Sequence, residues 1–193
     1  MQITTGHFNI FPILEFVAKN PLLPHNGSLN QKAYSETIRQ VVKGVPADKP
    51  GWYLWGKFND TGWWEAIYLG KAGKQKTSCL YNRLYDELRE EAVAFWAAVY
   101  GRETASKLQY KLYKGKYLSG VQRSMRKSNT HFVVWIACPD ISEAEVHKEE
   151  RALIHIYRPA NNAQREKYPD QSELTNELVH AIDEEIGRIK INI

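Results

Sequence analysis

The sequence predicts an α+β fold, with helices packed on a small, mainly antiparallel three-stranded sheet. Three runs rich in aromatic and β-branched residues have the length of strands, at 51–58, 64–69 and 131–138. Other segments repeat apolar residues at the spacing of a helix. These segments are 8–19, 30–43, 78–101, 142–158 and 172–191. This order of helices and strands is typical of an α+β domain.

Each of the two N-terminal helices is followed by a segment rich in helix breakers. "NPLLPHNGS" separates the first helix from the second, in which Ile38, Val41 and Val42 follow helical spacing. "KGVPADKPG" then ends the second helix with two prolines and two glycines. Such a cluster is the best candidate for a boundary in this chain.

The next two strands form a predicted hairpin closed by the turn "NDTG". Alternation places Tyr53 and Trp55 on one face of the first strand, and Ala66, Tyr68 and Gly70 on one face of the second. If the two faces coincide, two phenols lie side by side on the sheet. The alternative is purely structural, because tyrosines in hairpins commonly fill cross-strand pairs.

The segment from Ser78 to Gly101 predicts one helix or two abutting helices. Leu80, Leu84 and Leu88 recur every four residues and form the apolar stripe. Arg83 lies beside this stripe. An arginine at such a position is also explained by a side chain that simply carries its charge out to water.

The helix after Ser142 begins with a capping box, because Glu145 follows that serine three residues later. Glu149 and Glu150 both fall within its apolar arc, where a carboxylate is costly unless it is paired, protonated or bound to a metal. Helical periodicity does not distinguish between these two glutamates. The structural alternative is a salt bridge to a buried arginine such as Arg83.

Residues 104–139 contain no aspartate or glutamate, although the net charge of the whole chain is only +4. The basic residues of this stretch are Lys107, Lys111, Lys114, Lys116, Arg123, Arg126 and Lys127. An acid-free basic stretch favours phosphate binding, although a run of charge is also typical of a solvated surface.

Composition excludes several other classes of protein. The chain has two cysteines, Cys79 and Cys138, and no CxxC, which excludes a cysteine-rich zinc module and argues against a disulfide framework. No run approaches the ~20 apolar residues that a membrane helix needs. The N-terminus lacks the basic leader of an exported protein, so we expect a cytoplasmic protein without a membrane partner.

Taken together, these residues resemble the GIY-YIG nuclease domain. The family pattern is a Gly-x-Tyr strand, a turn, a Tyr-x-Gly strand, an arginine on the following helix, and a later helix with a glutamate and a trailing asparagine. Here the pattern is "GWY", "YLG" followed by Lys71, "LYNRL", and "EERALIHIYRPANN". Aligning "LI" and "RP" with the family's Leu-Ile, Pro and Asn selects Glu150 over Glu149 and Asn162 over Asn161.

The resemblance covers about residues 50–163. We therefore expect a single domain of residues 1–193 with this core, and helical extensions at 1–49 and 164–193. The core departs from the family in its length, since the segment from about residue 90 to residue 130 is longer than the minimal core requires. Such insertions are typical of the restriction-type members, where they help to grip DNA.

Two residues inside the motifs also depart from the family. Trp52 replaces the isoleucine of the first motif, which we expect to be harmless because this side chain faces away from Tyr53. Glu87 stands where some members carry a histidine, four residues after Arg83, so a histidine-assisted base is not expected.

The resemblance implies hydrolysis of phosphodiester bonds in double-stranded DNA with one divalent metal ion, Mg²⁺ or Mn²⁺. Glu150 would supply the hard oxygen ligand that such an ion prefers. Arg83 would offer a forked donor to the phosphate oxygens, whose charge grows in the transition state. Asn162 would brace the helix on the metal side through hydrogen bonds.

The attacking water needs a base, and the candidates are Tyr53 and Tyr68. A free phenol titrates near ~10, so Lys71 is expected to lower this pKa through its positive charge. We expect Tyr53 to be the base, and Tyr68 and Lys71 to position the water. The hairpin would then form the floor of a phosphodiester-cleaving site.

Among nucleases, a site-specific, type II restriction-like endonuclease fits the short chain and its basic stretch best. We expect the seven basic residues to contact the DNA. A structure-specific or repair nuclease stays open, as does a catalytically inactive DNA-binding module on the same fold. An aromatic-rich sheet that binds another ligand is the third alternative. A palindromic recognition site would favour a homodimer.

Overall fold

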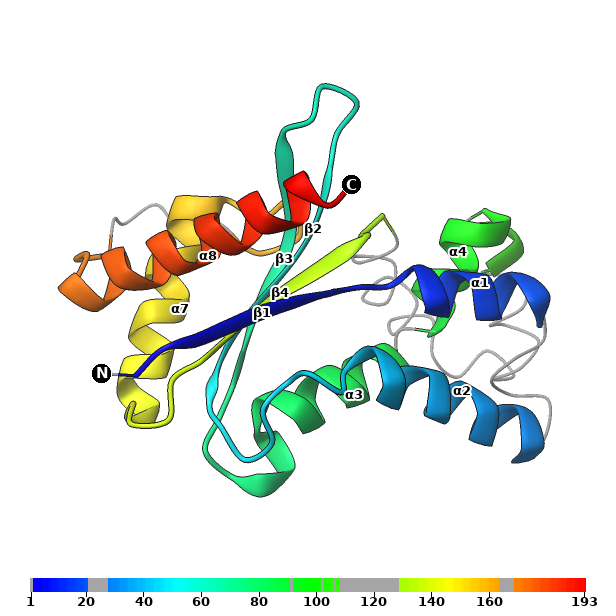
Figure 1. Cartoon of the computed structure of the whole chain (residues 1–193), viewed down its shortest axis with the longest axis horizontal. Coiled ribbons are helices and arrows are strands. Elements are labelled where there is room, and N and C mark those ends of the chain that lie inside the picture. The colour runs from blue at the N-terminus through cyan, green and yellow to red at the C-terminus, as the bar shows by residue number, and fades with distance from the viewer. Residues whose placement is uncertain are drawn as a thin grey trace.

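The computed structural model describes residues 2–20, 28–90, 92–101, 103–105, 107, 129–163 and 169–193. This part of the chain has an α+β fold built on a four-stranded antiparallel sheet, with strand order β1-β4-β2-β3 (Figure 1). The strands are β1 (Thr4–Asn9), β2 (Gly51–Phe58), β3 (Trp64–Ala72) and β4 (Phe132–Ala137). The sheet therefore has four strands where the sequence predicts three.

The additional strand is β1, which includes the start of the helix predicted at 8–19. That helix, α1, begins later and spans Phe11–Lys19. β1 pairs with β4, and Gly6 allows the ring of Trp135 to lie against its backbone, since a Cβ there would be 2.4 Å from Trp135 Cζ2. This strand forms because of contacts with residues that are distant in sequence, and the local sequence pattern does not predict such contacts.

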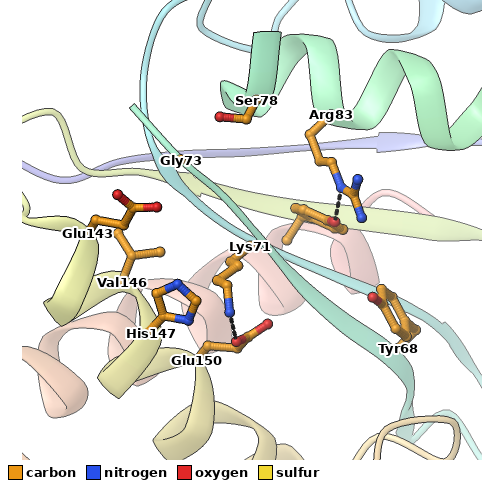
Figure 2. Close-up of a pocket in the computed structure, with 10 residues that line it drawn as sticks. Tyr68, Lys71, Gly73, Ser78, Arg83, Glu143, Val146, His147 and Glu150 are labelled. Carbon is orange, nitrogen blue, oxygen red and sulfur yellow. Dashed lines mark hydrogen bonds and ion pairs between the residues drawn. The ribbon is translucent and has the colours of Figure 1, made fainter. Parts of the chain in front are cut away.

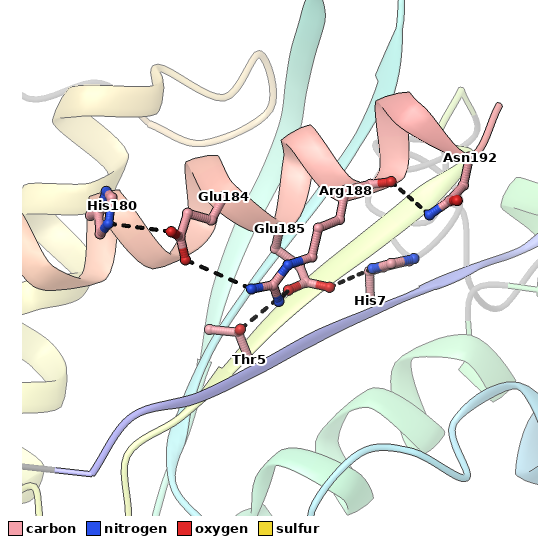
Figure 3. Close-up of polar contacts among 7 residues, drawn as sticks. All are labelled: Thr5, His7, His180, Glu184, Glu185, Arg188 and Asn192. Atoms are coloured by element: carbon pink, nitrogen blue, oxygen red, sulfur yellow. Dashed lines mark hydrogen bonds and ion pairs between the residues drawn. The ribbon is translucent and has the colours of Figure 1, made fainter.

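Helix α8 (Glu173–Ile191) holds β1 in place through a buried carboxylate (Figure 3). Glu185 is only 4% exposed and accepts a hydrogen bond from Thr5 Oγ1 at 3.2 Å. His7 Nδ1 lies 2.6 Å from the other carboxylate oxygen, Oε1, and Arg188 Nη1 donates at 2.7 Å to Oε2, the oxygen that Thr5 contacts. β1 and α8, which belong to the two segments predicted as helical extensions, therefore contact each other.

Helices cover both faces of the sheet (Figure 1). The first face, which carries Tyr53, Trp55 and Trp135, forms one hydrophobic core with residues of α1, α2, α3 and α4. The opposite face, which carries Trp52 and Val134, packs against α7 and α8. The bounds of the remaining helices are α2 (Ser28–Val41), α3 (Leu80–Glu90), α4 (Ala92–Tyr100) and α7 (Glu143–Tyr157). Burial on both sides explains why β4 is a continuous apolar run.

The ends of the helices follow the predicted signals. The helical segment that ends near Gly101 consists of two helices, α3 and α4, and Gly101 follows the second with a φ of +84°. At the start of α7, Glu145 N donates to Ser142 Oγ at 3.2 Å, and Ser142 N donates to the Glu145 carboxylate at 2.9 Å, which confirms the capping box. No helix in the described ranges is long and apolar enough to cross a membrane.

Candidate active site

The glycines of both hairpin motifs are required by close packing. Gly70 pairs with Tyr53 across β2 and β3, and the phenol ring lies over it. A Cβ at Gly70 would be 2.4 Å from the Tyr53 hydroxyl, and a Cβ at Gly51 would be 1.8 Å from the carbonyl oxygen of Ile136. Any larger residue at either position would displace the strand or the tyrosine.

The predicted faces of the hairpin coincide. Tyr53 is buried, and Tyr68 packs partly buried on the same side of the sheet. Trp52 faces the other side, where its Nε1 donates to the carbonyl oxygen of Val146 at 3.1 Å and ties β2 to α7. The prediction that Trp52 points away from Tyr53 is therefore confirmed.

The hydroxyl of Tyr53 is held between two side chains of α3. It donates to Glu87 Oε1 at 2.5 Å and accepts from Arg83 Nε at 3.3 Å. Arg83 Nε also lies 3.0 Å from the same Glu87 oxygen. Arg83 therefore pairs with Glu87, and the alternative of a salt bridge from Arg83 to Glu149 or Glu150 is wrong.

Burial raises the pKa of Tyr53 well above its usual value of 10.0, and the nearby charge of Glu87 raises it further. The prediction that Lys71 lowers the pKa of this phenol is wrong, because burial and the carboxylate outweigh any cation nearby. Tyr53 is therefore neutral near pH 7, with its proton directed at Glu87.

Glu87 is a site residue that sequence reasoning missed. The sequence drew attention to it only as a replacement for a histidine. It lies four residues after Arg83 and seven after Leu80, so both positions share its side of α3. This spacing next to the apolar stripe is the signal that could have found it, since a carboxylate aimed at the core needs partners.

Lys71 and Glu150 form an ion pair between β3 and α7 (Figure 2). Their side chains are 27% and 20% exposed, respectively, so both charges are partly shielded from water. Both side chains line a cavity to which β2, β3, α3 and α7 contribute residues. Glu150 thus faces the same space as the residues of the hairpin.

This cavity has a volume of about 400 Å³. Of the predicted catalytic residues, Tyr53, Tyr68, Lys71, Arg83 and Glu150 line it (Figure 2). Ser78, Glu143 and His147 also line it and were not singled out from the sequence. His147 and Glu143 lie three and seven residues before Glu150, so α7 presents all of them on one side.

Asn162 lies outside this cavity and clamps the edge of the sheet. Its Nδ2 donates to the carbonyl oxygen of Leu69 at 2.8 Å, and its Oδ1 accepts from Leu69 N at 2.7 Å. The neighbouring Asn161 N donates to the carbonyl oxygen of Ile67 at 2.9 Å. These bonds fix the segment after α7 to β3, an arrangement that fits the predicted bracing role.

The two adjacent glutamates of α7 have different surroundings. Glu149 is 2% exposed and accepts hydrogen bonds from Ser172 Oγ at 2.8 Å and Thr175 Oγ1 at 2.5 Å. It therefore joins α7 to the N-terminal end of α8. Glu150, one position on, reaches the cavity and Lys71 instead.

Replacing Glu149 with alanine is expected to lower the free energy of unfolding by about 2 kcal/mol, because two hydroxyl groups lose a charged acceptor in a buried position. The adjacent Glu150→Ala is the matched control, and we expect it to cost less than about 1 kcal/mol, as the loss of a partly solvated ion pair does. Denaturant unfolding of both variants measures the difference. A larger loss for Glu150→Ala would contradict these assignments.

Of the predicted DNA-contacting residues, only Lys107 lies within the described part of the chain. It is exposed and pairs with Glu103 at 2.6 Å. The other residues of this set lie outside the described residues. They are Lys111, Lys114, Lys116, Arg123, Arg126 and Lys127.

The residues at the cavity could supply only some of the ligands of a metal ion. No group of three or more histidine, cysteine or carboxylate residues in the described ranges could hold a metal ion. Mg²⁺ is often bound through one or two carboxylates, with water and substrate phosphates completing its six positions. Glu150 could serve as such a carboxylate, with space beside it in the cavity.

No protein-family model matches the chain, and neither a curated protein nor a solved structure matches it significantly. The resemblance to the GIY-YIG domain thus stays a prediction, which rests on the motifs and on the site residues. The chemistry of the residues that line the cavity is the basis for the function proposed below.

The raised pKa of Tyr53 predicts that both the ionisation of this tyrosine and the stability of the fold change in a particular way at alkaline pH. Its phenol is expected to stay protonated while ordinary tyrosines ionise near pH ~10. Since the unfolded chain loses this proton earlier than the folded chain, the free energy of unfolding should fall as the pH rises above about 10. Ultraviolet titration of tyrosinate in the wild type and in Tyr53→Phe checks this. An extra tyrosinate in the wild type near pH 10 would contradict it.

Proposed function

We propose that this chain is a metal-dependent endonuclease of the GIY-YIG family that hydrolyses phosphodiester bonds in DNA. The observation that supports it best is the content of one cavity. A phenol bonded to a carboxylate, two cations and a second carboxylate converge there from two strands and two helices. Phosphodiester hydrolysis needs these groups: a base for water, positive charge for the phosphate, and an oxygen ligand for a metal ion.

Activation of water would proceed through Tyr53 and Glu87. The attacking water gives a proton to the Tyr53 oxygen as its own oxygen bonds to phosphorus, and Tyr53 passes its hydroxyl proton to Glu87. The bond from phosphorus to the leaving 3′ oxygen breaks, and that oxygen takes a proton from solvent. This transfer avoids a free phenolate, which the raised pKa of Tyr53 disfavours near pH 7.

The remaining residues would bind and orient the phosphate. Arg83 keeps its Nε on Tyr53 and Glu87, which leaves the terminal nitrogens of its guanidinium group to face the non-bridging oxygens. Lys71 and Tyr68 would position the water and the phosphate. A divalent ion held by Glu150 would neutralise the charge that develops on the phosphate and the leaving oxygen.

Within this class we favour a site-specific, type II restriction-like enzyme acting on double-stranded DNA as a monomer or a homodimer. A structure-specific or repair nuclease would use the same residues on another substrate. The alternative from a different class is an inactive DNA-binding module. A buried phenol that is bonded to its own proton acceptor argues against it, since binding alone does not need that pair.

The test is digestion of supercoiled plasmid and linear phage DNA in Mg²⁺ and in EDTA. Discrete Mg²⁺-dependent fragments would support a site-specific enzyme, and their ends would give the recognition sequence. Nicks or a smear with the same metal dependence would support a structure-specific or poorly selective nuclease. DNA that is bound and never cut under either condition would contradict the catalytic proposal.

A further inference from the structure

The ion pair between Lys71 and Glu150 occupies the carboxylate that the proposed function assigns to a metal ion. Lys71 Nζ contacts Glu150 Oε2 directly, and both side chains are less than one-third exposed. Lys71 extends from β3 into the cavity, and Glu150 reaches it from α7 (Figure 2). The ammonium group therefore lies where a ligand of this carboxylate would have to bind.

The other cation of the cavity has its own partners. Arg83 Nε lies 3.3 Å from the hydroxyl of Tyr53 on β2 and 3.0 Å from Glu87 Oε1 on α3. Arg83 is not bonded to Glu150. The charge of Glu150 is thus balanced by Lys71 in the free protein. A divalent ion and an ammonium group on one carboxylate repel each other strongly in a partly shielded site.

We propose that Lys71 is an internal counter-ion that competes with the divalent metal ion for Glu150 until a nucleic-acid phosphate binds in the cavity. The phosphate attracts Lys71 away from Glu150, and the freed carboxylate then binds the ion. This regulation rests on the proposed function. It makes metal binding weak in the free protein and couples it to binding of the substrate.

The coupling is reciprocal, because each ligand favours the arrangement in which Lys71 has left Glu150. DNA raises the affinity for the metal ion by the same factor as the metal ion raises the affinity for DNA. Couplings of this kind are typically about 5- to 150-fold. Removing the ammonium group should therefore strengthen metal binding in the absence of DNA and abolish most of the coupling.

The first measurement is Mn²⁺ binding to the DNA-free full chain, followed by electron paramagnetic resonance. Lys71→Met keeps the length of the side chain without its charge, and we expect it to bind Mn²⁺ about tenfold more tightly than the wild type. Lys74→Met, which removes an exposed charge nearby, is the matched control and should change little. Glu150→Gln in the Lys71→Met background should abolish the gain.

The second measurement is the affinity for a fluorescent mixed-sequence duplex in EDTA and in Ca²⁺. The wild type should bind the duplex more tightly in Ca²⁺, and Lys71→Met should show less of this difference. Lys71→Gln repeats both measurements with a polar side chain, and thermal unfolding checks that each variant is folded.

The outcomes separate the inference from the function on which it rests. Glu150-dependent Mn²⁺ binding that Lys71→Met leaves unchanged or weakens would overturn the competition and leave the metal site intact. Mn²⁺ binding that is insensitive to Glu150→Gln in every background, or absent from every variant, would overturn both the competition and the metal-dependent function.

Discussion

Replacing Glu150 with alanine is expected to lower the rate of DNA cleavage at least about 1,000-fold. The metal ion supplies several kcal/mol of transition-state stabilisation, and each 1.4 kcal/mol corresponds to a factor of about ten in rate. In the described part of the chain, Glu150 is the carboxylate that contacts Lys71 at the cavity. Single-turnover cleavage in Mg²⁺ measures the loss.

The same substitution should not weaken DNA binding in EDTA, where no metal ion is bound to Glu150. It removes a negative charge from a site that binds phosphate and leaves the charge of Lys71 unbalanced, so affinity should stay the same or increase. Glu177→Ala removes an exposed carboxylate from α8 and is the control, with cleavage expected to match the wild type. A cleavage rate of Glu150→Ala within tenfold of the wild-type rate would contradict the assignment of Glu150 as the metal ligand.

Replacing Tyr53 with phenylalanine is expected to lower the cleavage rate by about 10²- to 10⁴-fold, the usual contribution of a general base. Phenylalanine fills the space over Gly70 and keeps the packing of the hairpin, while the path for the proton to Glu87 is lost. Glu87→Gln should give a loss of the same order, because its amide cannot take up the proton.

The variant Tyr68→Phe distinguishes the roles of the two tyrosines. Tyr68 lines the cavity, and its proposed role is to position the water, so its loss should cost much less than that of Tyr53. Comparing the two variants under single-turnover conditions gives the assignment. A larger loss for Tyr68→Phe would make Tyr68 the base and Tyr53 a packing residue.

Local pattern predicted most of the described elements because each has a local cause. The capping box at Ser142 fixes the start of α7, and the aromatic runs around the "NDTG" turn fix the hairpin. β1 could not be predicted in this way. Its place depends on Trp135 packing over Gly6 and on Glu185 of α8, which are far from it in sequence.

The candidate site was predicted in outline, and its interactions were not. The order of the motifs identified Arg83 and Glu150, and both line one cavity. Helical periodicity could not separate Glu149 from Glu150, because the contacts that bury Glu149 come from α8. Glu87 was missed for a similar reason, since its partner Tyr53 lies on another element.

The most direct test of the proposed nuclease activity is a metal-jump experiment on a preformed complex. The wild-type chain is bound to long mixed-sequence duplex DNA in EDTA, excess Mg²⁺ is added, and binding and strand breakage are followed in the same sample. We expect DNA that is bound and intact before the addition and broken after it. DNA that stays bound and intact at every Mg²⁺ concentration would contradict the proposed nuclease activity and identify the chain as a binding module.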